Sequence, residues 1–269
     1  MTRHNDDRGH AADLDRAIVT LARTDRLLLA LDFDGTLAPL VDAPDKARAL
    51  PEARSALQLL EHLDHTWVAY VSGRSVESLA HVAQADPDSL LIGSHGAEER
   101  LGRSSTSLRV TSHESKLLVQ LRSELAERVG YIDGIRLETK PLGFAVHYRG
   151  ASSDSVDRAL EALRGVEKNW THATTTRRGK DVVEFSIRTV TKGDAVERLR
   201  IFTGATGVFF AGDDLTDEDG FGALMTGDVG VKVGASPTLA SYSVADEHSL
   251  AGVLARIGEA RQEHLSTRL

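Results

Sequence analysis

Cysteine is absent from this chain of 269 residues. Its absence excludes disulfide bonds, a thiolate nucleophile and a cysteine-ligated metal centre. Long apolar runs are lacking as well, since no stretch approaches the roughly 20 apolar residues that a membrane-spanning helix needs. The opening segment, MTRHNDDRGHAADLDRA, contains no apolar stretch of the kind found in secretory signals. We therefore expect a cytoplasmic protein with no membrane partner.

Positive charge is scarce, because 32 lysines and arginines stand against 40 aspartates and glutamates, for a formal net charge of −8. There is no basic excess to neutralise the phosphates of a nucleic acid, so we expect no nucleic-acid partner. A small anionic ligand is still compatible with this charge, since positive groups can gather locally in a cleft. With 41% hydrophobic residues, the chain can bury a full core. We expect the protein to be a monomer.

Short apolar runs alternate with helical patterns along much of the chain. The apolar runs predict buried strands at 26–31, 67–71, 90–92, 207–211 and 229–233. Apolar residues recur on one helical face at 51–65, 193–202 and 249–260. Strands that alternate with helices predict the α/β class, with a doubly wound parallel sheet covered on both faces. For the first 25 residues we expect a helix packed on this core, with a disordered tail as the alternative.

The middle of the chain follows a different pattern, which indicates a smaller domain inserted into the larger one. Its order is αββαββ, an α+β arrangement. We predict that residues 102–188 form this insertion and that residues 1–101 and 189–269 form the core. The expected elements of the insertion are helix 114–129, strands near 135–139 and 143–148, helix 153–164, and strands near 171–176 and 181–187.

The candidate catalytic residues lie just after apolar strands. They occur in four segments: DFDGT (32–36), VSGR (71–74), TKG (191–193) and GDD (212–214). In parallel α/β sheets, ligands bind beyond the carboxyl ends of the strands, so these segments should converge in one crevice.

These residue types together suit phosphoryl transfer. Carboxylates at one sheet edge repel each other and favour a cation, and oxygen ligands without cysteine favour Mg²⁺ over Zn²⁺. A carboxylate can attack phosphorus, and an acid two residues further on can protonate the leaving alkoxide and later deprotonate water. Lys192 can supply fixed positive charge, and the hydroxyl of Ser72 can donate a hydrogen bond to the phosphoryl group.

The motifs resemble a known family. DFDGT, a serine after the second strand, a distant lysine and GDD are similar to the haloacid dehalogenase superfamily of aspartyl-phosphate enzymes. The segments DFDGTLAPL, VSGR, GSHGAE, FAVHYRG, GKDVVEF, TKGDAV and GDDLTDEDGF, from about residue 26 to 222, resemble the trehalose-6-phosphate phosphatases. The resemblance implies a Rossmannoid core with a C2B-type cap. It also implies Mg²⁺-dependent hydrolysis of trehalose 6-phosphate, the final step of trehalose biosynthesis, through an aspartyl phosphate.

The resemblance further implies a role for each matching residue. Asp32 would be the nucleophile and Asp34 the general acid and base, while Ser72 and Lys192 would hold the phosphoryl group. The implied Mg²⁺ site consists of Asp32, the backbone carbonyl of Asp34, and Asp213, with Asp214 and Asp217 in support. The implied sugar-binding residues are Arg74, His95, Glu98, Arg149, Lys180 and Glu184.

Several of these residues also have a purely structural interpretation. Asp32 and Asp34 could form a turn, Ser72 could cap a helix, and Lys192 could be a solvated surface lysine. The acids at 217–219 could be an ordinary first turn of a helix. Their order along the chain favours the functional interpretation of the core acids, the serine and the lysine.

His95 could be a turn histidine, and Arg149 could form a salt bridge in a loop. Lys180 and Glu184 have the spacing of a helix surface pair. The surrounding DVVEFSI predicts a strand instead, on which these two residues share one face.

Two other functions remain open. The same chemistry could act on sucrose 6-phosphate, glucosylglycerol phosphate or mannosyl-3-phosphoglycerate, with the inserted domain deciding between them. A non-catalytic phosphoaspartate binding or signalling module would also use an aspartate, an acidic pair and a lysine. Such a module needs neither Asp34 nor an insertion of this size, so both features favour the enzyme.

Overall fold

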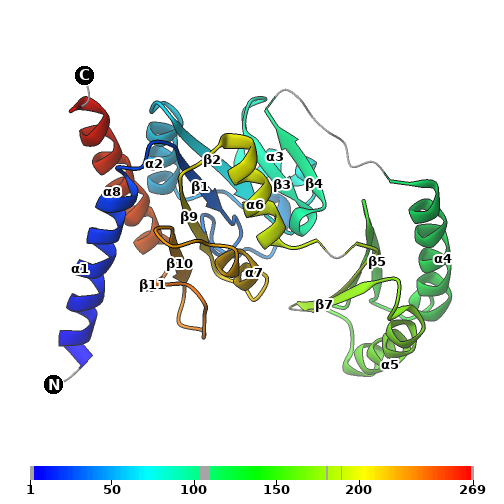
Figure 1. The fold of residues 1–269 in the computed structure, drawn as a ribbon. Helices are drawn as coiled ribbons and strands as arrows, with labels where there is room; N and C mark the ends of the chain where they lie inside the picture. Colours follow the sequence, from blue (N-terminus) through cyan, green and yellow to red (C-terminus); the bar gives the residue numbers. More distant parts are fainter. Residues whose placement is uncertain (1–2, 103–109, 180, 189, 268–269) are drawn as a thin grey trace. The chain divides into compact units, whose positions relative to one another are not determined.

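The protein is described by a computed structural model, which covers residues 3–102, 110–179, 181–188 and 190–267. Backbone contacts divide the chain into two compact units (Figure 1). The first unit is Met1–Thr106 with Thr191–Leu269, and the second is Ser107–Val190. The boundaries expected from the sequence, after residue 101 and before residue 189, differ from this division by a few residues.

The first unit contains a seven-stranded sheet in the order β11-β10-β9-β1-β2-β3-β4. All neighbouring strands are parallel except β3 and β4, which are antiparallel. The sheet is therefore mixed at one edge, whereas the sequence predicted a parallel sheet. The strands are β1 (Leu27–Leu31), β2 (Thr66–Val71), β3 (Leu90–Gly93), β4 (Glu98–Leu101), β9 (Gly207–Gly212), β10 (Val229–Val233) and β11 (Tyr242–Val244).

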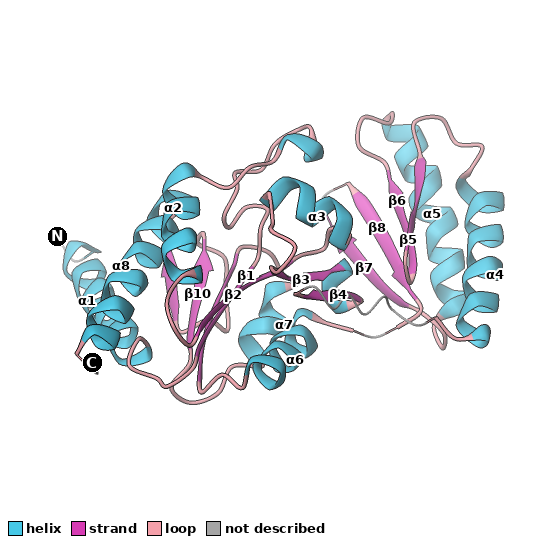
Figure 2. Cartoon of the chain, turned by 90° about the horizontal axis from the view of Figure 1, so that it is seen from above, coloured by secondary structure: helices cyan, strands magenta, loops and turns pink. Residues whose placement is uncertain are grey.

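Both faces of the central strand β1 are buried, which explains its continuous apolar sequence LLLAL. Leu27, Leu29 and Leu31 pack into one core, and Leu28 and Ala30 pack into the core on the opposite face. Helices α1, α2, α3 and α8 contribute to the first core, and α6 and α7 contribute to the second (Figure 2). The helices are α1 (Arg3–Leu21), α2 (Pro51–Glu61), α3 (Val76–Ala83), α6 (Lys192–Thr203), α7 (Asp217–Gly222) and α8 (Glu247–Ser266).

The expected helix at the start of the chain is confirmed as α1, whose Leu14 and Ile18 are buried in the first core. The helix predicted at 51–65 ends at Glu61, and His65 has a left-handed backbone with φ of 54° just before β2. None of the helices in the described ranges combines the length and the apolar character needed to cross a membrane.

The second unit has the predicted order αββαββ. Its four strands form an antiparallel sheet in the order β5-β6-β8-β7, and α4 and α5 share one apolar core with it. Its elements are α4 (Ser112–Val129), β5 (Arg136–Lys140), β6 (Gly143–His147), α5 (Ser153–Trp170), β7 (Thr175–Gly179) and β8 (Val182–Ser186).

Helix α5 is longer than predicted, so the strand expected at 171–176 lies at β7 instead. Val166 continues the buried face of the helix, and Trp170 packs against the same core. The indole N–H of Trp170 also donates to Glu124 of α4 at 2.8 Å. These contacts extend the helix beyond the predicted end at residue 164.

Candidate active site

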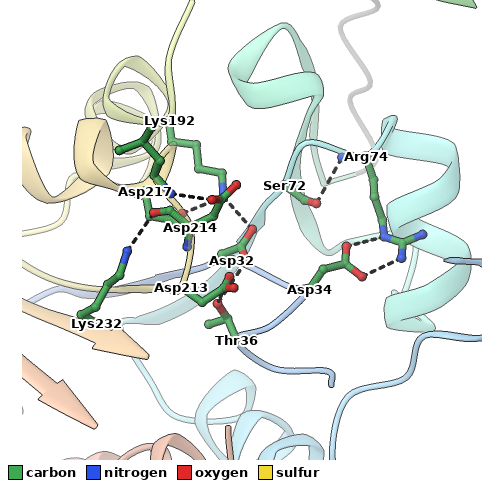
Figure 3. A network of polar contacts seen from close by, with 11 residues as sticks. Asp32, Asp34, Thr36, Ser72, Arg74, Lys192, Asp213, Asp214, Asp217 and Lys232 are labelled. Atoms are coloured by element: carbon green, nitrogen blue, oxygen red, sulfur yellow. Dashed lines mark hydrogen bonds and ion pairs between the residues drawn. The ribbon is translucent and has the colours of Figure 1, made fainter. Parts of the chain in front are cut away.

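Three of the candidate segments follow adjacent strands in the middle of the sheet. β1 pairs with β2 on one side and with β9 on the other, all parallel. Asp32 follows β1, Ser72 follows β2 and Asp213 follows β9. The sheet therefore brings these three residues to one edge, and α6 begins there with Lys192 (Figure 3).

Lys192 links two buried carboxylates. Its Nζ donates to Oδ1 of Asp32 and to Oδ1 of Asp217, both at 2.6 Å, and its side chain is only 2% exposed. Burial alone lowers the pKa of Lys192, but the charges of Asp32 and Asp217 outweigh it and raise that pKa above its ordinary value. Lys192 is therefore a permanently charged group inside the site.

Burial raises the pKa of Asp32 well above its ordinary range, and Lys192 opposes this shift. Thr36 connects Asp32 to a third acid, Asp213. The hydroxyl of Thr36 lies 3.1 Å from Oδ2 of Asp32 and 3.2 Å from Oδ1 of Asp213. The pKa of Asp213 is raised to about 6, first by burial and then by the charge of Asp217. Lys192 thus bonds to two of the three carboxylates, and Asp213 is linked to Asp32 through Thr36.

Asp32, Asp213 and Asp217 each present an oxygen within 4.8 Å of the others. Burial raises the pKa of both Asp32 and Asp213, the charges of the neighbouring acids raise it further, and a bound cation would offset that repulsion. An all-oxygen donor set of this kind suits a hard divalent ion. The described residues therefore fit Mg²⁺.

Two glycines allow the acids to come this close. A Cβ on Gly35, whose φ is 79°, would lie 2.2 Å from Oδ2 of Asp213. A Cβ on Gly212 would lie 2.1 Å from Cγ of Asp217. Any larger residue at either position would displace a carboxylate.

Asp214 lies beside this cluster but is not one of its three carboxylates. Its exposed side chain accepts from the N–H of Leu215 at 2.7 Å, and its own N–H donates to Oδ2 of Asp217 at 2.9 Å. Asp214 thus helps to orient Asp217, which is fully buried.

Lys232, which was not among the residues predicted from the sequence, contacts the segment that follows β9. Lys232 lies on β10 and is buried. Its Nζ donates to the backbone carbonyl of Asp214 at 2.9 Å and to Oε1 of Glu218 at 3.1 Å. Oε2 of Glu218 in turn accepts from the hydroxyl of Thr238 and the N–H of Leu239. A lysine inside the apolar run VGVKV was the available signal, since a buried cation needs a partner.

Asp34 points away from the cluster, toward Arg74 (Figure 3). Nε and Nη2 of Arg74 each donate to a different oxygen of Asp34, both at 2.6 Å. Ser72 is buried, and its hydroxyl accepts from the N–H of Arg74 at 3.2 Å. The loop after β2 therefore joins the predicted phosphoryl ligand to the predicted general acid.

His95 and Glu98 lie on the segment that follows β3. A Cβ on Gly73 would lie 2.6 Å from Nε2 of His95, so the imidazole packs directly on the Ser72–Arg74 loop. The carboxylate of Glu98 accepts from the hydroxyl of Ser94. His95 thus contacts the Ser72–Arg74 loop and Glu98 bonds to Ser94, and the proposed contacts of both residues with sugar stay predictions.

The other predicted sugar ligands belong to the second unit. Arg149 is exposed, and its Nε lies 3.9 Å from Oδ2 of Asp181. Glu184 is half-buried on β8, between Val183 and Phe185, which both face the core of this unit. Glu184 therefore lies on the sheet face opposite to α4 and α5. Lys180 is outside the described residues.

Comparison with known proteins identifies relatives that match most of the chain. The sequence model of the family described as trehalose-phosphatase matches residues 30–251. The chain is 34% identical to the trehalose-phosphate phosphatase of Mycobacterium leprae, over 81% of this chain and 54% of the relative. It is also 34% identical to the trehalose-6-phosphate phosphatase of Escherichia coli, over 80% of each protein. The chain thus spans about half the length of the mycobacterial relative.

Among solved structures, the C-terminal domain of the trehalose-6-phosphate phosphatase of Candida albicans is similar, with a TM-score of 0.77. The match covers 91% of this chain and 96% of that one at 21% identity. A haloacid dehalogenase-like hydrolase from Bacillus subtilis matches with a TM-score of 0.58 at 17% identity, over 84% of this chain and 98% of that one. These likenesses confirm the predicted fold class of a haloacid dehalogenase-type α/β core with an α+β insertion.

Proposed function

The chain belongs to the trehalose-phosphatase family, and from this premise we propose that it hydrolyses trehalose 6-phosphate to trehalose and phosphate. The contact between Lys192 and Asp32 is the observation that carries this proposal. It joins a carboxylate at the end of β1 to a buried positive charge, beside two further acids that fit a divalent cation. A carboxylate so placed can act as a nucleophile on an anionic phosphate.

In the proposed reaction, Asp32 attacks the phosphorus of the substrate. A bond forms between phosphorus and the Asp32 carboxylate as the bond from phosphorus to the sugar O6 breaks, and Asp34 gives its proton to O6. Water then attacks the phosphorus, Asp34 accepts the proton of that water, and the bond to Asp32 breaks. Phosphate leaves, and both aspartates return to their starting state.

Lys192 and Ser72 hold the phosphoryl oxygens in this scheme, and Lys192 offsets the negative charge that spreads over them. Mg²⁺, when bound, supplies further positive charge to the same oxygens. The residues proposed to hold it are Asp32, the backbone carbonyl of Asp34, and Asp213, with Asp214 and Asp217 in support.

We propose that the second unit acts as a cap that selects the sugar. Polar groups that bind sugar hydroxyls reject substrates that leave them unpaired. The residues proposed for this role are Arg149, Lys180 and Glu184 in the second unit, and His95 and Glu98 in the first. The cytoplasmic location and the monomeric state stay predictions from the sequence.

The direct test is phosphate release from trehalose 6-phosphate, compared with sucrose 6-phosphate, glucose 6-phosphate, mannosyl-3-phosphoglycerate and p-nitrophenyl phosphate. Each substrate is assayed with Mg²⁺ and with EDTA. Asp32→Asn serves as the blank, and Asp219→Asn, an exposed acid of α7, is the matched control. We expect strong preference for trehalose 6-phosphate, lost with EDTA and in Asp32→Asn but kept in Asp219→Asn.

Metal-dependent turnover that prefers another sugar phosphate would keep Asp32 and Asp34 in their roles and refute the sugar assignment. Folded protein that turns over none of these substrates would favour a phosphoaspartate binding module instead.

A further inference from the structure

We infer that Arg74 is a positioning residue for Asp34 and not a sugar ligand. It holds the carboxylate of Asp34 apart from the acid cluster. The inference rests on the proposed phosphatase function, and it adds Arg74 as the residue that positions the general acid Asp34.

The contact between the two side chains is a two-pronged one. Nε and Nη2 of Arg74 meet both oxygens of Asp34 at 2.6 Å. The side chains are 13% and 28% exposed, so neither is a freely solvated surface group. Paired hydrogen bonds of this kind fix the plane and the direction of a carboxylate, which a single lysine contact does not.

Arg74 is itself fixed on several sides. Its Nη1 donates to the hydroxyl of Ser78, in the first turn of α3, at 3.3 Å. Its backbone N–H donates to Ser72, and its carbonyl accepts from the N–H of Ser94 at 2.6 Å. The three guanidinium nitrogens thus all have acceptors within the first unit, and the protein sets the direction of the side chain before any substrate arrives.

The segment that holds the Arg74 carbonyl is strained. Ser94 and His95 both have left-handed backbones, with φ of 48° and 56°. Non-glycine residues adopt this conformation at a cost, and such residues gather where function requires a fixed geometry. The N–H of His95 donates to the carbonyl of Ser72 at 3.0 Å, so the strained turn is attached to the loop on both sides of Gly73. The strained turn therefore fixes the position of the Ser72–Arg74 loop.

The need for such a device follows from the neighbouring charges. Asp34 is two residues from Asp32, which pairs with Lys192 and belongs to the proposed cation site, and positive charge there attracts a carboxylate. A fourth acid that turned into the cluster would add to the repulsion between its three carboxylates, whereas the proposed reaction needs Asp34 to exchange a proton with the sugar oxygen. Arg74 offers Asp34 a competing partner outside the cluster, and Figure 3 shows Asp34 turned toward it.

This role predicts a dependence on the leaving group. Phenyl phosphate expels a basic phenoxide that needs a proton, whereas p-nitrophenyl phosphate expels a weakly basic phenolate that does not. Neither substrate contains a sugar. Misdirection of Asp34 should therefore slow release of phenol much more than release of p-nitrophenol in the first turnover.

The experiment measures first-turnover product release from both aryl phosphates, together with kcat and KM, in Arg74→Gln, Arg74→Lys and Ser78→Ala. Arg16→Gln on α1, an exposed arginine far from this loop in the fold, is the control. We expect Arg74→Gln to slow phenol release by about 10²-fold, in the range of proton-transfer catalysis, and p-nitrophenol release by only a few fold. KM should stay nearly constant.

Arg74→Lys should recover only part of the phenol rate, because lysine lacks the paired geometry. Ser78→Ala should show a smaller loss in the same direction. These two milder variants keep the test informative if Arg74→Gln does not fold.

Unchanged rates on both aryl phosphates, with a raised KM for the sugar phosphate, would overturn the inference and make Arg74 a sugar ligand. Equal losses on both aryl phosphates would also overturn it, because they would indicate a structural role alone. If the wild-type protein hydrolyses neither aryl phosphate nor any sugar phosphate, the proposed function fails and the inference fails with it.

Discussion

The side chain of Lys192 lies 2.6 Å from that of Asp32, although 160 residues separate them in the chain. The second unit lies between these residues in the sequence, so the site is completed only when the chain returns to the first unit. The start of α6 fixes the lysine, because Thr191 and Asp194 form a reciprocal pair of capping hydrogen bonds around it. Lys192 is therefore held by a well-defined helix end and not by a flexible loop.

Replacing Lys192 with alanine should lower kcat by at least about 10²-fold, because the buried positive charge acts where negative charge develops. The measurement is steady-state phosphate release at saturating Mg²⁺. Lys116→Ala, an exposed lysine of α4, should retain full activity. Activity of Lys192→Ala close to that of the control would remove Lys192 from the mechanism.

Replacing Lys232 with methionine should lower the free energy of unfolding by about 2–4 kcal/mol, since it leaves Glu218 and the carbonyl of Asp214 without their buried partner. The same change should weaken Mg²⁺ binding, measured by calorimetry, because Asp214 follows Asp213 directly.

The double variant Lys232→Met with Glu218→Gln separates the effect of the unpaired charge of Glu218 from the effect of the unpaired carbonyl of Asp214. If the unpaired charge of Glu218 is responsible, the double variant should be more stable than Lys232→Met alone. A fully additive loss in urea unfolding would show that the ion pair contributes no coupling.

Arg261 of α8 should be a major determinant of stability without a role in catalysis. It is fully buried and donates to the backbone carbonyls of Ala22, His65 and others at the amino ends of β1 and β2. Arg261→Met leaves several of these acceptors unpaired and should cost about 3 kcal/mol or more. Arg256→Met, which removes a partly exposed ion pair with Asp15, should cost less than about 1 kcal/mol. Urea unfolding of both variants, with activity assayed below the transition, checks the contrast.

Glu114 should make the stability of the second unit depend on pH. Hydrogen bonds from Arg188 and from the N–H of Thr111 lower the pKa of Glu114 to about 2. A carboxyl whose pKa is lower in the folded state stabilises that state above its unfolded pKa, near 4.5, and loses this effect as pH falls toward about 2.

The difference in unfolding free energy between the wild type and Glu114→Gln should therefore be constant above about pH 5 and shrink as pH falls toward about 2. Glu127→Gln, an exposed residue of the same helix, serves as the reference. A difference that stays constant down to about pH 2 would contradict the assignment.

Much of the core fold could be predicted from the sequence because its strands are buried on both faces. A continuous apolar run such as LLLAL has few alternatives to a central strand. The edge strands β4 and β11 carry no such signal, since β4 is only half-buried and β11 has three residues. The extra turns of α5 depend on a contact between Trp170 and Glu124, which no local pattern shows.

The residues of the site also divide into those that the sequence could predict and those that it could not. The positions of Asp32, Asp213 and Lys192 could be predicted, because a parallel sheet gathers the carboxyl ends of its strands. The contact of Arg74 with Asp34, and the support of the acid loop by Lys232, depend on which side chains meet in three dimensions. A charged residue in a buried element, such as Lys232 or Arg261, indicates that a partner exists but not which one.

The most direct test of the central claim is the identity of the residue that carries phosphate during turnover. The protein is mixed with trehalose 6-phosphate and Mg²⁺, quenched in acid within the first turnover and reduced with borohydride, which converts a phosphoaspartate into homoserine. Peptide mass spectrometry should then find homoserine at position 32, only when substrate and Mg²⁺ are both present, and never in Asp32→Asn. Phosphate release without homoserine at position 32, or with the label at another acid, would contradict Asp32 as the nucleophile.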